Sequence, residues 1–230
     1  MRIIQNERRI KTLSKAGRTI PWVALLALAV GLVLSFLRPE LVWATFLALV
    51  VGLVLSVIGG YYAERYAGPL AHHIALPRAL KGLNDRYLLA EYILPAEHVL
   101  LSPDEVTVFL VKSQPGAVTY ADGRWSHHFR GKFFRQIAGM ESLGTPHIEA
   151  QREAHKFKRW LEKTLPDANV PVQTAIVFVS PKVELQAEGS PVPAFYGKKV
   201  KGWLRDSGSR GDQLTAEDYQ RIREAIEASA

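Results

Sequence analysis

The 230-residue sequence contains no cysteine. Disulfide bonds and thiolate metal ligands are therefore excluded, and the absence agrees with a reducing compartment. No Walker-type loop, Cys-x-x-Cys pair or Gly-x-Ser-x-Gly segment occurs either. Nothing in the sequence therefore supports nucleotide hydrolysis on a phosphate-binding loop, a cysteine-based zinc centre or serine catalysis.

Charged side chains are also missing from two long segments, residues 20–37 and 41–62. Each segment has about the 20-residue length that spans the hydrocarbon core of a bilayer. Only Arg38, Pro39 and Glu40 separate them. The sequence therefore predicts a transmembrane hairpin of two α-helices, embedded in the lipid bilayer and joined by a very short turn.

Two alternatives to the membrane hairpin are a buried helical pair in a soluble protein and a cleaved signal peptide. The first is disfavoured because no charged residue interrupts either hydrophobic run. The second is disfavoured because another hydrophobic run follows at once and no Ala-x-Ala site ends the first. The runs also lack ionisable residues, so a transport path or proton relay has no groups to use.

The net charge of +7 is unevenly distributed along the chain. Residues 1–19 hold six basic side chains against Glu7, whereas residues 64–230 hold 22 basic and 20 acidic side chains, a balance of only +2. The excess beside the first hydrophobic run predicts a positive-inside anchor that can contact anionic headgroups. Both termini and the soluble domain are therefore expected on the cytoplasmic side of the cell membrane.

The two hydrophobic runs repeat one another, as "LALAVGLVLS" at 26–35 and "LALVVGLVLS" at 47–56. Small residues recur at every fourth position, which lets two helices approach closely. We interpret this repeat as packing within the hairpin, and a homodimer through the second helix is the alternative. The small residues are Ala27, Gly31 and Ser35, then Ala44, Ala48, Gly52, Ser56 and Gly60.

The rest of the chain has the pattern of an α/β (α+β) domain with a mixed central sheet flanked by helices. We expect a connector at 63–77, the domain at 78–205, and a linker with a C-terminal helix at 206–230. The expected elements are a helical stretch at 78–91, a hairpin of 99–101 and 106–111, a third strand at 117–125 that bends at Asp122-Gly123, a helix after Pro146, a buried strand at 172–180 and a helix capped by Thr215.

The hairpin has the outline of a metal-dependent phosphodiesterase site. If its turn closes at 102–105, the residue numbers of opposed positions add up to 207. This register places Glu97 opposite Leu110 and diagonal to Lys112. Two carboxylates and a lysine in this arrangement hold Mg²⁺ or Mn²⁺ and stabilise charge on a phosphate. Here Leu110 occupies the position of the second acid. Without further context, Glu97 and Lys112 are equally consistent with solvated residues at strand ends.

"AEHVLLSPDEVTVFLVKSQPGAVTYADGRW", residues 96–125, resembles a degenerate nuclease-related domain (NERD), a branch of the PD-(D/E)XK nuclease-like superfamily. Three later segments are similar to the family's next helix, buried strand and closing helix, so that the resemblance extends over residues 78–228. They are "GTPHIEAQREAHKFKRWLEKTL", "VPVQTAIVFVSP" and "LTAEDYQRIREAI".

The resemblance implies roles for individual residues. Glu97 corresponds to the first metal acid, Lys112 to the motif lysine, and Leu110 stands where the family has a glutamate. Glu91 corresponds to an acid on the preceding helix. His98 corresponds to the histidine beside the first acid.

The family's Asn-Pro is Thr145-Pro146 here, and Glu149 or Gln151 is nearest to the glutamine that follows it. Since a leucine side chain provides no oxygen ligand, the resemblance implies an impaired metal site.

Histidine pairs and one basic segment offer further candidate sites. Neighbouring residues on a strand point to opposite faces, so His72-His73 and His127-His128 each provide at most one ligand to a given metal. The segment "RWSHHFRGKFFR", 124–135, interleaves basic and aromatic residues and is the strongest candidate for nucleic-acid binding. Its aromatic residues are equally suited to the core or the membrane interface. The basic residues are Arg124, Arg130, Lys132 and Arg135.

Together these patterns predict a membrane-anchored, NERD-like protein with a degenerate and inactive nuclease site. It would act by binding DNA, RNA or a protein at the cytoplasmic membrane face. The alternative is a membrane-tethered, Mg²⁺- or Mn²⁺-dependent nuclease with an altered site.

Overall fold

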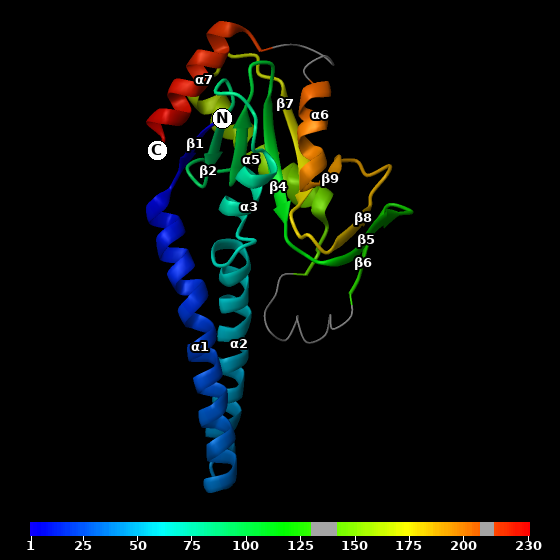
Figure 1. Ribbon diagram of the computed structural model, residues 1–230. Helices are drawn as coiled ribbons and strands as arrows, with labels where there is room; N and C mark the ends of the chain where they lie inside the picture. Colours follow the sequence, from blue (N-terminus) through cyan, green and yellow to red (C-terminus); the bar gives the residue numbers. More distant parts are fainter. Residues whose placement is uncertain (130–141, 208–213) are drawn as a thin grey trace. The chain divides into compact units, whose positions relative to one another are not determined.

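The computed structural model describes residues 1–129, 142–207 and 214–230 (Figure 1). The chain divides into two compact units. One is an α/β unit made of Met1–Glu7, His72–His128 and Leu143–Ala230, and the other contains Arg8–Ala71 with Phe129–Ser142. The basic residues Arg130, Lys132 and Arg135 lie outside the described residues.

The second unit contains two long helices, α1 (Glu7–Leu37) and α2 (Val42–Tyr66). Both are long and apolar enough to cross a membrane, and only 11% of the most apolar window of each is buried. The expected apolar hairpin is therefore confirmed. Helix α1 begins well before residue 20, because the basic segment that precedes the hydrophobic run continues the same helix.

Glycines lie where the two helices meet. A Cβ atom built on Gly31 would be 2.9 Å from Cβ of Ala48, and one on Gly52 would be 2.6 Å from Leu28. Both distances are shorter than real carbon contacts, so a larger residue at either position would require Leu28 to move or the helix backbones to separate. The small residues at Gly31 and Gly52 therefore serve packing within the hairpin, as the repeat predicted.

The α/β unit is built on a six-stranded mixed sheet in the order β1-β2-β3-β4-β7-β9. Strand β3 runs antiparallel to its two neighbours, β2 and β4, whereas β1 pairs in parallel with β2, β7 with β4 and β9 with β7. The strands are β1 (Arg2–Gln5), β2 (Leu88–Glu91), β3 (His98–Leu101), β4 (Val106–Lys112), β7 (Val172–Phe178) and β9 (Ala194–Tyr196). Val99 pairs with Val108 and Leu101 with Val106, which confirms the expected hairpin register.

Helices cover both faces of this sheet. Alternation along β3 directs Val99 and Leu101 to the core under α5 (Pro146–Thr164) and α7 (Ala216–Ala228). It directs Leu100 to the other face of the sheet, which packs under α3 (His72–Ala79) and α6 (Val200–Ser207). Helix α6 follows the short 3₁₀ helix Gly197–Lys199.

The expected helix after Pro146 and the expected buried strand at 172–180 correspond to α5 and β7. At the start of α7, Oγ1 of Thr215 accepts a hydrogen bond from the Asp218 amide at 3.0 Å, which confirms the expected cap.

The strand expected at 117–125 is two strands of a separate sheet. β5 (Gly116–Ala121) and β6 (Arg124–His128) form a hairpin, and β8 (Val183–Gln186) pairs in parallel with β5. Asp122 and Gly123 have φ angles of 50° and 75°. Because two successive positive φ angles reverse the chain tightly, the Asp-Gly pair closes a hairpin where we had expected a bend.

The prediction of a helical stretch at 78–91 was wrong. Helix α3 ends at Ala79, and Leu88–Glu91 is strand β2, in which all four residues are buried. A strand covered on both faces has a continuous apolar run, which periodicity alone does not distinguish from a buried helix. Glu91 is therefore the last residue of a strand and not an acid on a helix.

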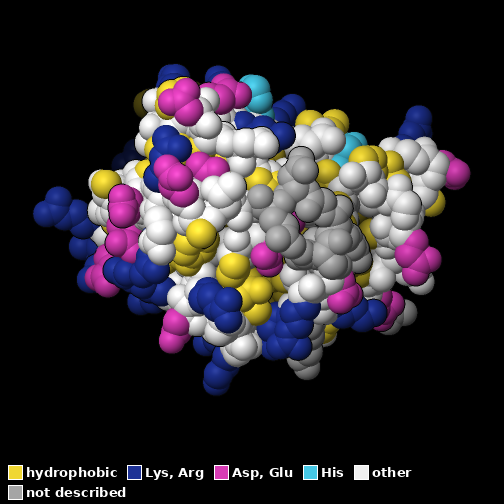
Figure 2. All heavy atoms as spheres, turned by 90° about the horizontal axis from the view of Figure 1, so that it is seen from above, with side chains coloured by type: hydrophobic (Ala, Val, Ile, Leu, Met, Phe, Trp, Pro, Cys, Tyr) yellow, Lys and Arg dark blue, Asp and Glu magenta, His cyan; other side chains and the backbone are white. Residues whose placement is uncertain are grey.

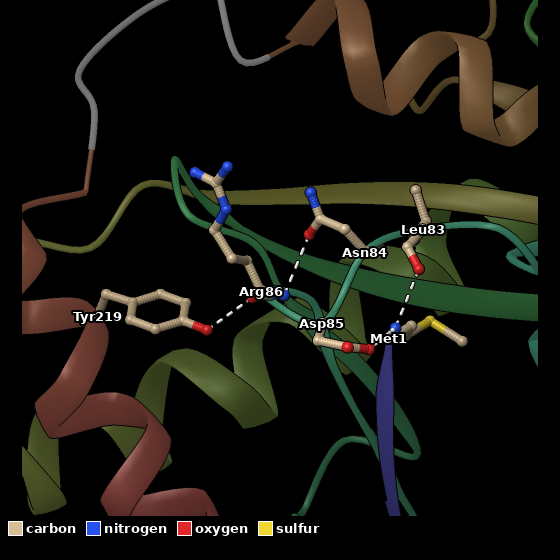
Figure 3. A network of polar contacts seen from close by, with 6 residues as sticks. All are labelled: Met1, Leu83, Asn84, Asp85, Arg86 and Tyr219. Carbon is tan, nitrogen blue, oxygen red and sulfur yellow. Dashed lines mark hydrogen bonds and ion pairs between the residues drawn. The ribbon is translucent and has the colours of Figure 1, made fainter.

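Strand β1 was not predicted from the sequence. It pairs in parallel with β2, and the turn before β2 holds it in place (Figure 3). The ammonium group of Met1 donates to the Leu83 carbonyl and to Oδ1 of Asp85, both at 2.9 Å. This contact lowers the pKa of the Asp85 carboxyl group. The Tyr219 hydroxyl donates to the Arg86 carbonyl at 2.6 Å, which attaches α7 to the same turn.

The close contact of Gly52 generates the first prediction. Gly52→Leu should lower the thermal unfolding midpoint of the helical hairpin, because its side chain would overlap Leu28 and overpacking costs about 1–3 kcal/mol. Circular dichroism of the full chain in detergent measures this midpoint. Val51→Leu is the control, since Val51 is exposed on the hairpin. Equal midpoints for the two variants would contradict the packing described above.

Candidate functional site

Lys112, the motif lysine, is the last residue of β4, and its side chain is only 1% exposed. Its Nζ atom donates to Oε2 of Glu149 at 2.7 Å. Glu149 lies in the first turn of α5, where its Oε1 atom accepts a hydrogen bond from the Thr145 amide at 3.1 Å. Both carboxylate oxygens of Glu149 are thus engaged, one with the lysine and one with the start of the helix.

Leu110 lies two residues before Lys112 on β4, at the position where the site would need its second acid. Its side chain is buried in an apolar cluster with Ala150, Ile176 and Phe178. The strand therefore provides a packing residue there, and the carboxylate beside Lys112 comes from α5 instead. Of the two candidates for the family's glutamine, Glu149 contacts the lysine, whereas Gln151 is exposed.

Glu97, the expected first metal acid, immediately precedes β3. Its backbone amide donates to Oε2 of Glu153 on α5 at 3.2 Å, and its carbonyl accepts from the Tyr92 amide at 2.8 Å. The side chain of Glu97 belongs to a group with His72 and His98, in which one ligand atom from each residue lies within 4.8 Å of the others. The acid is therefore grouped with histidines, while the ion pair of Lys112 leads to α5.

A second acid lies beside these histidines. Glu91 and His98 are register partners across β2 and β3, and Oε1 of Glu91 is 3.5 Å from Nδ1 of His98. The Glu91 side chain is fully buried and that of His98 is 2% exposed. The His98 ring lies 5.8 Å from the ring of His72 and 4.9 Å from that of Tyr92.

His73 is close enough to this cluster to interact with its charges. Its pKa is lowered, chiefly because burial disfavours the imidazolium form; the Glu91 carboxylate opposes this shift and His98 adds to it. Of the pair His72-His73, only His72 belongs to the group with Glu97 and His98 that could hold a metal ion. The expected limit of one ligand per pair assumed a strand, whereas both histidines lie on helix α3, where neighbouring side chains do not point to opposite faces. A nitrogen of the His127 ring instead shares a hydrogen bond with the Pro115 carbonyl at 2.8 Å.

The role of His98 in a group that could hold a metal ion was not predicted from the sequence. The available signal was the adjacent pair Glu97-His98 opposite another acid, Glu91. It could be recognised only if residues 88–91 were assigned to a strand, because cross-strand pairing brings Glu91 and His98 together.

The basic and aromatic segment is described only as far as Phe129. Arg124 is exposed at the start of β6. Trp125 donates from Nε1 to Nδ1 of His147 at 2.9 Å, and its ring lies 5.2 Å from that of Tyr120. Trp125 therefore packs within the domain, as the alternative interpretation of this segment expected.

The charge on the visible face of the molecule is mixed. Lys and Arg side chains are interspersed with Asp and Glu side chains in Figure 2. This agrees with the balance of +2 over residues 64–230 and limits electrostatic attraction to nucleic acid.

A surface recess of about 480 Å³ is located between α5 and β7. Its lining includes His155 and Lys158 of α5 and Gln173 and Thr174 of β7. Lys112 instead pairs with Phe178, at the opposite end of β7. The recess is therefore a feature distinct from the strand-end lysine.

The fold is a mixed α/β domain in which a buried lysine at the end of β4 pairs with Glu149 of α5. Residues 70–179 match the family model described as "Nuclease-related domain" (NERD). The match begins before residue 78 and ends at Val179, so β8, β9, α6 and α7 lie beyond it. Comparisons with curated proteins and with solved structures gave no match.

The ion pair between Lys112 and Glu149 generates a stability prediction. Glu149→Gln should destabilise the α/β unit by roughly 1–3 kcal/mol, because the buried ammonium group loses its charged partner. Adding Lys112→Met should recover part of this loss, since the buried charge is then removed as well. Thermal unfolding of the full chain, monitored by near-UV circular dichroism, measures both effects.

Glu162→Gln is the matched control, since Glu162 is exposed on the same helix. A loss no larger than that of Glu162→Gln would show that the ion pair does not stabilise the domain.

Proposed function

We propose that this chain is a membrane-anchored protein whose nuclease-related domain is catalytically inactive and acts by binding. The observation that carries the proposal is the ion pair between the buried Lys112 side chain and Glu149. A catalytic lysine must reach a phosphate or a water molecule, and the acids beside it must hold a cation. Here the lysine is buried, and its neighbouring carboxylate is engaged with it.

The residue two positions before this lysine supports the same conclusion. Leu110 packs in the core at the position of an oxygen ligand. Mg²⁺ and Mn²⁺ need several oxygen ligands, and an isobutyl side chain contributes none. The family resemblance therefore supports the fold. The chemistry needs two acids on the strands and a lysine that can reach the substrate, but Leu110 is not an acid and Lys112 is buried.

The apolar helices support the membrane anchor. Their exposed side chains include Trp22, Phe36, Trp43 and Phe46, each more than 60% exposed. Water would disfavour so large an apolar surface, whereas lipid would cover it. The basic residues before the hydrophobic run favour a cytoplasmic N-terminus, and a two-helix hairpin returns the chain to the same side.

The bound partner is a nucleic acid or a protein at the membrane face. Arg124, together with Arg130, Lys132 and Arg135 of the undescribed segment, provides the positive charge for phosphate contacts. Since the soluble part carries only +2, we expect binding of DNA or RNA to be weak and sensitive to salt.

An active, membrane-tethered nuclease is the second candidate function. One observation favours it: Glu149 places a carboxylate 2.7 Å from the motif lysine, close to where the strand acid is missing. In this alternative, Glu149 and Glu97 would hold Mg²⁺ or Mn²⁺. Opening of the ion pair would be required before Lys112 could contact a substrate.

A nuclease assay separates the two functions. The full chain in detergent, with Mg²⁺ or Mn²⁺, should not cleave DNA or RNA above the level of a Lys112→Ala variant. Leu110→Glu adds a carboxylate at the position of the missing acid and should raise the affinity for Mn²⁺. Efficient cleavage by the unmodified chain that Lys112→Ala abolishes would establish the active nuclease instead.

Protease protection tests the proposed orientation. In sealed inside-out vesicles, the protease should digest the α/β unit and leave only a fragment that contains α1 and α2, because both ends of the hairpin face outward. Detergent-permeabilised vesicles provide the control for access to the hairpin. Protection of the α/β unit in intact vesicles would contradict a cytoplasmic domain.

A further inference from the structure

Glu91 and His98 form a buried polar pair whose environment is incomplete. Among the described residues, neither carboxylate oxygen of Glu91 and neither ring nitrogen of His98 makes a hydrogen bond. Their closest approach, 3.5 Å, is longer than a normal charge-assisted hydrogen bond. Buried polar groups nearly always have partners, so this pair indicates a bound ligand that satisfies them.

The neighbouring side chains have the composition of a metal site. His72 begins α3, whereas Glu97 and His98 stand at the start of β3. Their ligand atoms lie within 4.8 Å of one another. A tetrahedral Zn²⁺ ion lies about 2.0–2.2 Å from each ligand atom, which sets these atoms about 3.3–3.6 Å apart. Small side-chain movements are therefore enough to close the group around one ion.

We propose that His72, Glu97 and His98 bind a divalent transition-metal ion, with Zn²⁺ as the best fit. Imidazole nitrogen suits zinc and its neighbours in the transition series, whereas Mg²⁺ prefers oxygen ligands and octahedral geometry. Two histidines and one glutamate also leave a fourth position for water. The ligand set thus selects a different ion from the one that the nuclease motif would hold.

Glu91 acts in this site as a positioning residue. A metal-binding histidine usually donates the hydrogen of its other nitrogen to a carboxylate, which fixes the tautomer and the ring orientation. Oε1 of Glu91 faces Nδ1 of His98, so Nε2 of His98 is the nitrogen available to the metal. The cross-strand pairing of these residues sets this geometry.

The site lies on the opposite face of the sheet from the strand-end lysine. His98 shares the face of Leu100, which packs under α3 and α6. Lys112 shares the face of Val108, which packs under α5 and α7. Metal binding would therefore hold the start of α3 against the start of β3, whether or not the domain cleaves nucleic acid.

The site has both an enclosed interior and an access route. His72 and His98 are 2% and 1% exposed, so the ligands are shielded from bulk water. Glu97 is partly exposed, and the loop of residues 92–97 that precedes it closes through the hydrogen bond from the Tyr92 amide to the Glu97 carbonyl. A metal ion can therefore enter beside Glu97.

Metal binding by the full chain tests the proposal directly. The protein in detergent micelles is treated with a chelator and dialysed against Zn²⁺, and bound metal is measured by mass spectrometry. We expect one Zn²⁺ per chain, no displacement by millimolar Mg²⁺, and a higher thermal unfolding midpoint. Co²⁺ in the same site should give the intense visible absorption of a four-coordinate ion.

The variants separate this site from chance binding by other histidines. His72→Gln and Glu97→Gln should each lower the affinity at least about 100-fold, and Glu91→Gln about 10–100-fold, as expected for loss of a ligand and of its supporting carboxylate. His155→Gln is the control, since His155 is exposed on α5. It should leave binding unchanged.

Two results would overturn the proposal. One is zinc binding that His155→Gln lowers as much as His72→Gln does. The other is the weak, six-coordinate spectrum of Co²⁺ with the unmodified chain, which would show that the chain does not hold the ion in a four-coordinate site. The spectrum is recorded on the unmodified chain and does not depend on whether any variant folds.

Discussion

The alternation of side chains along β3 and β4 is the constraint on which the rest of the domain depends. It divides the hairpin into one face under α5 and α7 and another under α3 and α6. Leu110 and Lys112 are on the first face, and His98 is on the second. A single hairpin therefore carries two polar groups that helices from different parts of the chain complete: Glu149 of α5 for the lysine, and His72 of α3 for the histidine.

The two groups differ in how their charges are balanced. Lys112 is buried, and a buried ammonium group is tolerated only with a partner, which Glu149 provides at 2.7 Å. Leu110 provides no carboxylate on β4 beside the lysine, and α5 provides one instead. The same carboxylate holds the Thr145 amide at the start of the helix. The pair thus joins β4 to α5.

Local pattern predicted the parts of the fold that depend on neighbouring residues. The uncharged runs predicted the helical hairpin, period-two alternation predicted the register of Val99 with Val108, and Thr215 predicted the start of α7. Strand β1 could not be predicted in this way, because its partner β2 is more than 80 residues away. Without β1, residues 88–91 had no reason to be a central strand, and Glu91 was assigned to a helix.

That one misassigned strand explains why the buried cluster was not anticipated. The sequence placed Glu97 beside Lys112 as the remainder of a magnesium site, whereas the structure groups its side chain with His72 and His98. Glu97 immediately precedes β3, and its side chain reaches the group of His72 and His98. Leu110 provides no oxygen ligand on the face of the sheet under α5. The proposed zinc ligands are richer in nitrogen, and His98 lies with Glu91 on the other face, where Leu89 and Leu100 pack under α3.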